Sequence, residues 1–511
     1  IVKDNISHGV TKVLKSISKN ESRIKPHNMW SSLVTSVLTI GFGGSVGAEA
    51  PIVYTGAAIG SNFGRLGRLS YRNMTILVGC GAAGAVAGIF KAPLAGLLFT
   101  MEILLFNISL ASMMPLLVST VSATVVSYLF TGMDTAFHCT LEPFVLKNIP
   151  FYLVLGVACG FLSLYFTHTT LKLEDYFAKM RSPMFKWLIC SLGVGVLVFL
   201  FPPLYGEGYG DITALLNGIG GEMKGSPLNF LMNSKWGIVV AFAAVMFFKV
   251  LSMTLTNAGG GVGGTFGPTL FVGAIAGFVI ARVLNNVLGE AFWLLPEQNF
   301  VLVGMAALMA GVMQAPMTSM FLIAEMTGGY DLFLPLIAAC TVSFCVTRIW
   351  ERYSIYTKRL AQTGELLTHD SDQAVLTLLN TADLVRDKYP RISLDATLKD
   401  IMPEVSESTA AVFPVVGSDG VFQGLVEMDD IRKKMFDTAN YSNIHVYNLM
   451  KQPAAYVTID EKAASVLDKF EKTGAWRLPV IDEQHHYLGF ISKSRILSAY
   501  RESLKSISLG D

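Results

Sequence analysis

The sequence predicts an all-α polytopic membrane domain with broken helices and an internal repeat, followed by a soluble α/β segment. Of its 511 residues, 52% are hydrophobic and only 15% are charged, and 40 of the charged residues follow residue 356. From there on, short β-like runs alternate with amphipathic helices. A net charge of +1 without a long basic run excludes a nucleic-acid-binding protein.

Apolar stretches recur across residues 28–356, and several are shorter than the roughly 20 residues that a membrane-spanning helix needs. Gly and Pro interrupt others. Irregular backbone at membrane depth persists only where protein buries it or a wet cavity solvates it, so the breaks predict a polar site inside the helix bundle. The stretches are 74–90, 94–106, 110–130, 151–168, 184–201, 236–256, 269–288, 300–327 and 332–349.

An internal repeat divides this apolar region into two related halves. Residues 81–102 align without gaps on residues 304–325, and each copy follows a Gly-rich segment that ends in Pro, at 43–51 and 259–268. Related halves place the substrate site at their interface near the bilayer midplane. The repeat alone leaves open whether the halves are parallel or inverted.

The tail contains a second repeat, at an offset of 65 residues. It predicts two copies of one small α/β module. The matched positions include Leu384/Leu449, Asp395/Asp460, Pro414/Pro479, Val415/Val480, Gly424/Gly489 and Ile431/Ile496.

Glu49 is the strongest candidate for a functional residue. It stands in Gly47–Pro51, between Gly-rich backbone and an apolar run. An ionisable group at membrane depth costs free energy and is by default a functional candidate. The second half offers Gly264–Pro268, which has the same pattern without an acid. Both segments expose N–H groups at a helix N-terminus, which favours an anion. Two such termini would form an anion site with no fixed positive charge, from which the anion can leave; close helix packing is the alternative interpretation.

These segments resemble the CLC family of chloride channels and chloride/proton exchangers. Gly47–Pro51 (GAEAP) is similar to the family's G(K/R)EGP, Gly264–Pro268 (GTFGP) fits GxFxP, and Tyr356 falls where the pore tyrosine ends the membrane region. The tail resembles paired CBS domains. The resemblance implies an inverted repeat, a homodimer with one pore per subunit, and a multi-pass protein with a cytoplasmic tail.

The expected organisation has five parts. An N-terminal segment on the cytoplasmic side leads into the membrane domain, and its short length suggests that family-typical helices precede it. The ranges are 1–27 for this segment, 28–356 for the membrane domain, 357–382 for a linker, 383–440 for the first CBS domain and 441–505 for the second.

The resemblance also assigns roles to single residues. Glu49 is the gate, whose ionised carboxylate competes with the anion and whose protonation admits chloride. The amides of Thr265 and Phe266 and the hydroxyl of Tyr356 hold the central anion, and the amides of Ala48 to Ala50 form the outer site. For Tyr356 the alternative is an interfacial aromatic with its hydroxyl among the lipid headgroups.

Two positions depart from the family pattern. His8 stands in place of the pore serine; its ring N–H can donate to chloride, while the alternative is an ordinary loop histidine. Met133 falls at the expected position of the inner proton relay, so the nearest candidate acid is Asp134, which a helix cap would explain equally well. Glu102 and Glu325, which recur in both halves, are expected to cap helices or form inter-helix hydrogen bonds, because buried carboxylates need partners; a role in transport is the alternative.

The tail retains only parts of a nucleotide site. CBS sites that bind adenine nucleotides use Gly-x-x-(Thr/Ser)-x-x-Asp; the first module keeps the acid as Asp430 and the second keeps the hydroxyl as Ser492. An adenine nucleotide is therefore an optional ligand of the tail, and a purely dimerising tail is the alternative.

The expected function is transmembrane chloride transport gated by Glu49, with chloride/proton antiport favoured over a passive voltage- or pH-gated channel. A CBS-bearing divalent-cation channel would need several pore carboxylates as oxygen ligands, and the membrane region supplies few. That region also has no HExxH, Ser-His-Asp-like or phosphate-loop pattern. We therefore expect neither an enzyme nor a metal site nor a required cofactor, with chloride, protons and lipid as partners.

Overall fold

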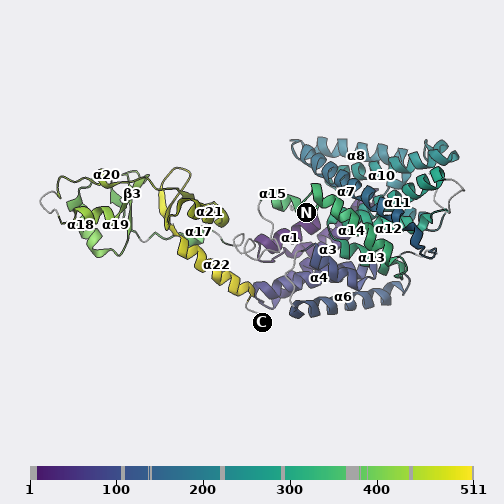
Figure 1. Cartoon of the computed structure of the whole chain (residues 1–511), viewed down its shortest axis with the longest axis horizontal. Helices are drawn as coiled ribbons and strands as arrows, with labels where there is room; N and C mark the ends of the chain where they lie inside the picture. The colour runs from purple at the N-terminus through teal and green to yellow at the C-terminus, as the bar shows by residue number, and fades with distance from the viewer. Residues whose placement is uncertain are drawn as a thin grey trace. The chain divides into compact units, whose positions relative to one another are not determined.

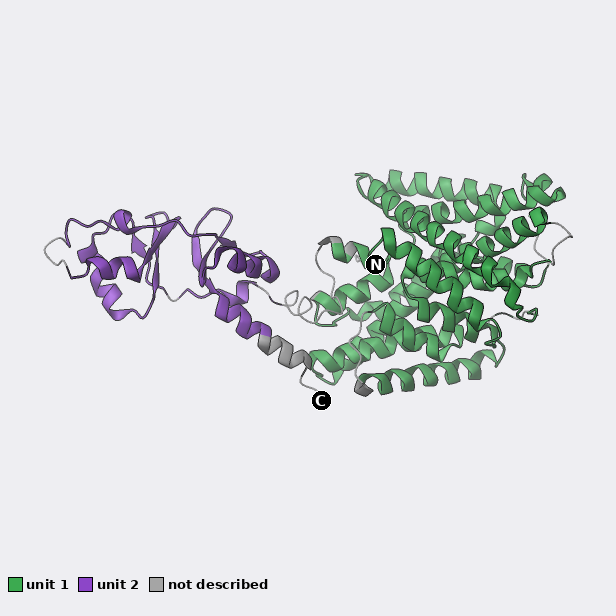
Figure 2. Cartoon of the chain, in the orientation of Figure 1, with its two compact units in different colours: residues 1–366 green, residues 367–511 purple. Residues whose placement is uncertain are grey.

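The computed structural model describes residues 8–104, 110–135, 137, 141–218, 225–288, 294–363, 379, 381–387, 389–436 and 441–508. The chain forms two compact units, residues 1–366 and residues 367–511 (Figure 2). The two units are considered separately below.

The secondary-structure elements of the first unit are all helices in the residues that the structure describes, and loops and turns connect them (Figure 1). Seven described helices are long and apolar enough to cross a membrane, which confirms the predicted polytopic all-α domain. The α-helices are α1 (Gly9–Lys19), α2 (Ser31–Gly41), α3 (Glu49–Leu66), α4 (Tyr71–Phe90), α5 (Pro93–Glu102), α6 (Leu110–Thr131), α7 (Ile149–Ala178), α8 (Pro183–Leu200), α9 (Tyr209–Leu216), α10 (Lys235–Ala258), α11 (Phe266–Leu288), α12 (Glu297–Met313), α13 (Pro316–Thr327), α14 (Phe333–Trp350) and α15 (Lys358–Thr363). Short 3-10 turns are η1 (Pro26–Met29), η2 (Leu146–Asn148), η3 (Pro202–Leu204) and η4 (Asn229–Asn233).

The sequence repeat corresponds to two matching sets of three helices. In the first half α3 packs on α4, which leads into α5; in the second half α11 packs on α12, which leads into α13. Both α5 and α13 are short and begin at a proline, Pro93 and Pro316. Proline fits the first helical position because its missing N–H has no intrahelical partner there. These short helices are the broken helices that the apolar pattern predicted.

Glu102 and Glu325 connect the two halves reciprocally. Glu102, the last residue of α5, accepts hydrogen bonds from the backbone N–H groups of Met317 (3.0 Å) and Thr318 (2.7 Å) in the first turn of α13. Glu325 of α13 accepts from those of Leu94 (3.1 Å) and Ala95 (2.9 Å) in the first turn of α5. A carboxylate beside the positive end of a helix is stabilising. The expected capping role is therefore confirmed, with each half capping the other.

The second unit contains two modules of the same topology. The strands are β1 (Ile392–Ser393), β2 (Val412–Val416), β3 (Phe422–Glu427), β4 (Val457–Thr458), β5 (Arg477–Ile481) and β6 (Tyr487–Ser492). They form two sheets, β1-β2-β3 and β4-β5-β6, each with one parallel and one antiparallel pair. The helices are α17 (Thr381–Leu384), α18 (Leu398–Glu407), α19 (Met428–Lys434), α20 (Val446–Leu449), α21 (Ala463–Thr473) and α22 (Lys493–Ser508).

The strand register of the two modules follows the sequence repeat. Val415 pairs with Gly424 in the first sheet, and Val480 pairs with Gly489 in the second. Each residue of the second pair lies 65 residues after its counterpart in the first pair, which is the offset of the sequence repeat. The predicted pair of α/β modules is thereby confirmed.

Candidate functional site

Two helix N-termini meet inside the first unit. Gly47 and Gly264, which precede α3 and α11, exchange backbone hydrogen bonds of 3.1 and 2.7 Å in an antiparallel bridge. Antiparallel pairing of corresponding segments is what an inverted repeat produces. A Cβ added to Gly47 would lie 2.1 Å from Glu49 Oε2, so glycine is needed to leave room for that carboxylate. The bridge thus holds two positive helix ends next to one acid.

Glu49 extends from one half of the repeat to the other. It is the first residue of α3 and only 2% exposed. Its Oε2 accepts a hydrogen bond from the Gly267 N–H (3.2 Å), in the first turn of α11, and its Oε1 accepts one from the Tyr209 hydroxyl (2.5 Å). The carboxylate therefore occupies an amide at which an anion held by the α11 N-terminus would bind.

A small cavity with several polar side chains in its lining lies on the Tyr356 side of this junction. The Thr265 hydroxyl donates to the Tyr356 hydroxyl (3.2 Å), and both residues are buried. The cavity measures about 20 Å³ and is also lined by Ala50 and His8, which gives room for one water-sized occupant. Phe266, whose amide was expected at the central site, is the first residue of α11. The structure thus gathers most of the predicted anion-binding residues around one point.

Glu174, on α7, lines the same cavity and was not expected from the sequence. Its Oε1 lies 3.5 Å from the Nε2 atom of His8, and its side chain is 8% exposed. Glu174 stands in the charged stretch at the end of a long apolar helix, so its local pattern indicates an ordinary solvated acid. Only the fold brings this buried acid next to His8 and Tyr356.

Glu207 contacts the expected outer site. Its Oε1 accepts a hydrogen bond from the Ala48 N–H (2.8 Å), immediately before α3. Ala48, predicted to offer its amide to an outer anion, thus donates to a carboxylate. Gly206 and Gly208 on either side of Glu207 both have positive φ, 62° and 91°, which glycine adopts without strain. This Gly-Glu-Gly turn was the sequence signal that could have identified Glu207.

Lys249 corrects the expectation of a site without a fixed positive charge. It lies in α10, is fully buried, and donates to the carbonyl oxygens of Gly206 (2.8 Å) and Leu204 (3.5 Å). Glu207 and Asp211 are close enough to interact with it electrostatically. The buried lysine is therefore compensated by acids and bound to the Glu207 loop, which keeps its charge from holding a passing anion alone. A single Lys inside the apolar run 236–256 was its sequence signal.

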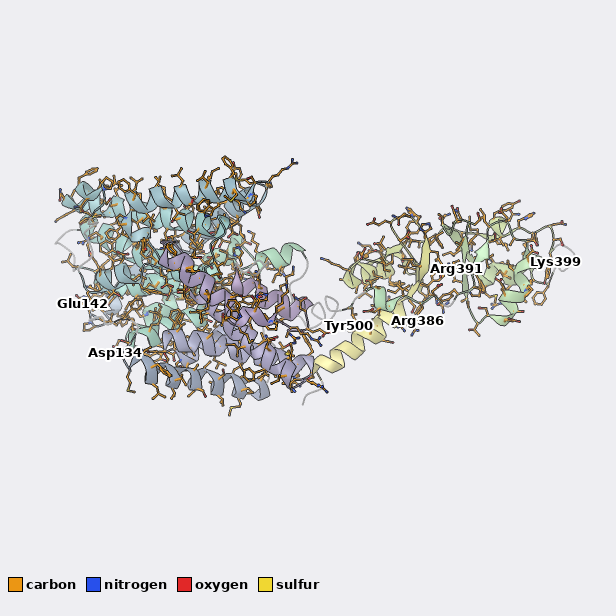
Figure 3. All side chains as sticks on the ribbon, turned by 180° about the vertical axis from the view of Figure 1, so that it is seen from behind. Asp134, Glu142, Arg386, Arg391, Lys399 and Tyr500 are labelled. Atoms are coloured by element: carbon orange, nitrogen blue, oxygen red, sulfur yellow. The ribbon has the colours of Figure 1, made fainter. Side chains whose placement is uncertain are left out.

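Met133 and Asp134 lie away from the Tyr356 cavity. They follow α6, Met133 is 81% exposed, and the backbone oxygen of Asp134 accepts from Lys91 Nζ. Asp134 and Glu142 lie at one edge of the unit (Figure 3). The Glu142 carbonyl is bound by the first turn of α12, whereas the last turn of α12 binds the backbone of Ile355. About 20 Å of helix separates these two ends of α12. Met133 and Asp134 therefore lie too far from the Tyr356 cavity to serve as an inner proton relay beside it.

Ser492 and Asp430, the two residues predicted to bind a nucleotide, have different surroundings. A cavity of about 1050 Å³ in the second unit is lined by Ser492 and by Asp429. Asp430 instead pairs with Lys451 and with Lys433 (3.0 Å), and these lysines hold the pKa of its carboxyl below the usual range. Asp429 therefore lines the cavity in place of Asp430, and nucleotide binding by the tail stays a prediction.

Comparison with known proteins decides the family. Residues 2–348 match the voltage gated chloride channel family, and residues 382–437 and 446–502 each match the CBS domain. The chain belongs to the CLC family. It is 29% identical over 363 residues to a putative ClcB-like chloride channel protein of Ralstonia nicotianae, an alignment that covers 70% of this chain and 80% of the relative.

Solved CLC structures share the fold. A slow cyanobacterial Cl⁻/H⁺ antiporter superposes with a TM-score of 0.57 at 24% identity, covering 70% of this chain and 86% of that one. A CLC-type fluoride/proton antiporter superposes with a TM-score of 0.54 at 21% identity, covering 68% and 80%. The helical unit of this CLC chain therefore has the fold of known transporters.

Proposed function

We propose that this CLC protein transports chloride across a membrane by exchanging it for protons, with Glu49 as the gate. The observation that carries the proposal is the Glu49 carboxylate, bound to the Gly267 amide at the junction of the two halves. An ionised carboxylate there is a tethered competitor of a free anion, and a protonated one is not. Relatives named as chloride channels and structural neighbours named as antiporters agree with anion transport.

For exchange, protons must also reach Glu49 from the Tyr356 side, and this step requires a further acid. Glu174 is a buried carboxylate in the cavity that Tyr356 and His8 line. The cavity has room for about one water, and Ala50, beside Glu49, also lines it. We therefore assign the proton-accepting role on this side to Glu174, in place of Asp134.

A chloride gradient imposed on sealed liposomes is expected to drive uphill proton movement that persists when a potassium ionophore clamps the voltage. Glu174→Gln is expected to slow that proton movement about tenfold or more while chloride still moves, because the amide cannot carry the proton. Asp134→Asn, an exposed acid at the opposite edge, serves as the control and is expected to match the wild type.

The two variants and the wild type test antiport and the role of Glu174 separately. Chloride movement without proton movement in the wild type would make the protein a channel and contradict antiport. Normal coupling in Glu174→Gln would leave antiport intact and remove Glu174 from the proton path.

Tyr356→Phe is expected to weaken chloride binding only several-fold, measured by calorimetry on the purified protein. The hydroxyl supplies one hydrogen bond, worth about 0.5–1.5 kcal/mol, or 1.5–3 kcal/mol to a charged partner, while the amides of α11 remain. Tyr353→Phe, three residues earlier, is the control and is expected to leave the affinity unchanged. Unchanged affinity in both Tyr356→Phe and Tyr356→Ala would place Tyr356 outside the site.

The proposal includes a homodimer and a cytoplasmic tail, as the resemblance implies. Exposed apolar side chains along α6, among them Val118, Val121 and Leu129, suit contact with lipid or with a second copy. In the tail, the cavity lined by Ser492 and Asp429 has the size of a small-ligand site, which supports adenine-nucleotide binding as an optional function.

A further inference from the structure

The loop that carries Glu207 is fixed tightly against the junction of the two halves. Gly208 packs so closely on α11 that an added Cβ would lie 2.3 Å from the ring of Phe271. On the other side of Glu207, the Gly206 carbonyl is bound by Lys249, whose Nζ also lies 4.7 Å from the centre of the Phe271 ring. The position of Glu207 is therefore set by the fold around it.

Two carboxylates share the amides of the junction. Glu207 accepts from the Ala48 N–H at the start of α3, while Glu49 accepts from the Gly267 N–H at the start of α11. The two acids are close enough to interact electrostatically. An anion that takes the Ala48 amide must therefore displace Glu207 as well as meet the charge of Glu49.

The charged groups around Glu207 come from α3, α9 and α10, and a single lysine interacts with three acids. Lys249 of α10 interacts electrostatically with Asp211, Glu207 and Glu49. Tyr209 of α9 donates to Glu49 and also interacts electrostatically with Glu207. Lys249 of α10, which donates to the Gly206 carbonyl next to Glu207, also interacts electrostatically with the Glu207 carboxylate. The loop thus offers its carboxylate two stabilising partners, the amide and the lysine.

We propose that Glu207 is a second tethered carboxylate, which competes with the transported anion for the Ala48 amide. The anion then enters from the Ala48 side only when Glu49 and Glu207 have both left the amides that they bind. This inference rests on the proposed function, since it takes the Ala48 amide as an anion site. It goes beyond that function because two acids from distant parts of the chain, Glu49 and Glu207, must both move before an anion can bind at the Ala48 amide.

The test compares Glu49→Gln with the double variant Glu49→Gln/Glu207→Gln, by chloride calorimetry and by chloride efflux from liposomes. With Glu49 neutral, removing the second carboxylate is expected to tighten chloride binding about tenfold and to speed efflux. Equal affinity and efflux in the single and double variants would overturn the proposal.

Asp211→Asn in the Glu49→Gln background is the matched control. Asp211 also faces Lys249, but it is Glu207 that accepts from the Ala48 amide. Unchanged affinity in this control supports competition at the amide, whereas a gain equal to that of Glu207→Gln would mean that the freed lysine charge draws the anion in, which overturns the proposal.

Glu207→Asp covers the case in which a neutral side chain beside Lys249 prevents folding. Aspartate keeps the charge but is one methylene shorter, so it withdraws from the Ala48 N–H. In the Glu49→Gln background it is expected to tighten chloride binding several-fold, and no gain would count against competition. Absence of chloride efflux from the wild type as well as from every variant would contradict the proposed function itself.

Discussion

Glu49→Gln is expected to keep chloride flux intact or faster and to abolish coupled proton movement. Glutamine has the shape of a protonated glutamate but carries no charge and releases no proton. The wild-type carboxylate accepts hydrogen bonds from the Gly267 amide and the Tyr209 hydroxyl, so its charge is what occupies the junction. Without that charge the amides are available to an anion.

The measurement is simultaneous recording of chloride and pH in liposomes, with Asp134→Asn as a control that removes an acid at the distant edge. The control is expected to behave as the wild type. Retention of wild-type proton coupling by Glu49→Gln would exclude Glu49 as the gate. Chloride flux that still rises at low pH in Glu49→Gln would be assigned to Glu207 by its loss in the double variant.

Gly81→Ala and Gly304→Ala are each expected to destabilise the membrane unit severely. The two glycines are equivalent in the repeat. An added Cβ on Gly81 would lie 2.0 Å from the backbone oxygen of Gly56, and one on Gly304 would lie 2.3 Å from that of Gly273. Both contacts are with backbone, so a whole helix must move. Overpacking of this kind costs about 1–3 kcal/mol and occasionally more.

The thermal unfolding transition of the purified protein in detergent checks this expectation. Gly195→Ala is the matched control, because Gly195 also lies within a helix but an added Cβ meets nothing within 4 Å. The control is expected to unfold at the wild-type temperature. Wild-type transitions in both Gly81→Ala and Gly304→Ala would show that the helix crossings are looser than the structure has them.

Several features of the fold could be predicted because they depend on local sequence. Pro93 and Pro316 begin short helices, since proline suits the first helical position whatever surrounds it. The capping roles of Glu102 and Glu325 followed from their recurrence in both halves, although the sequence did not show that each caps the other half. The repeat at constant offset predicted two equivalent tail modules, and the structure shows that their strands pair in equivalent registers.

The sequence by itself determined the family, the two halves, the two tail modules and the single gate candidate, Glu49. Only the tertiary structure showed what surrounds that gate. Glu207 and Tyr209 reach the junction from positions 159 and 160 residues away from their partners, and Lys249 compensates the charge of Glu207 from yet another helix. Helix starts and repeats are written in neighbouring residues, whereas the contacts of a buried charge depend on which distant segments the packing of the whole chain brings beside it.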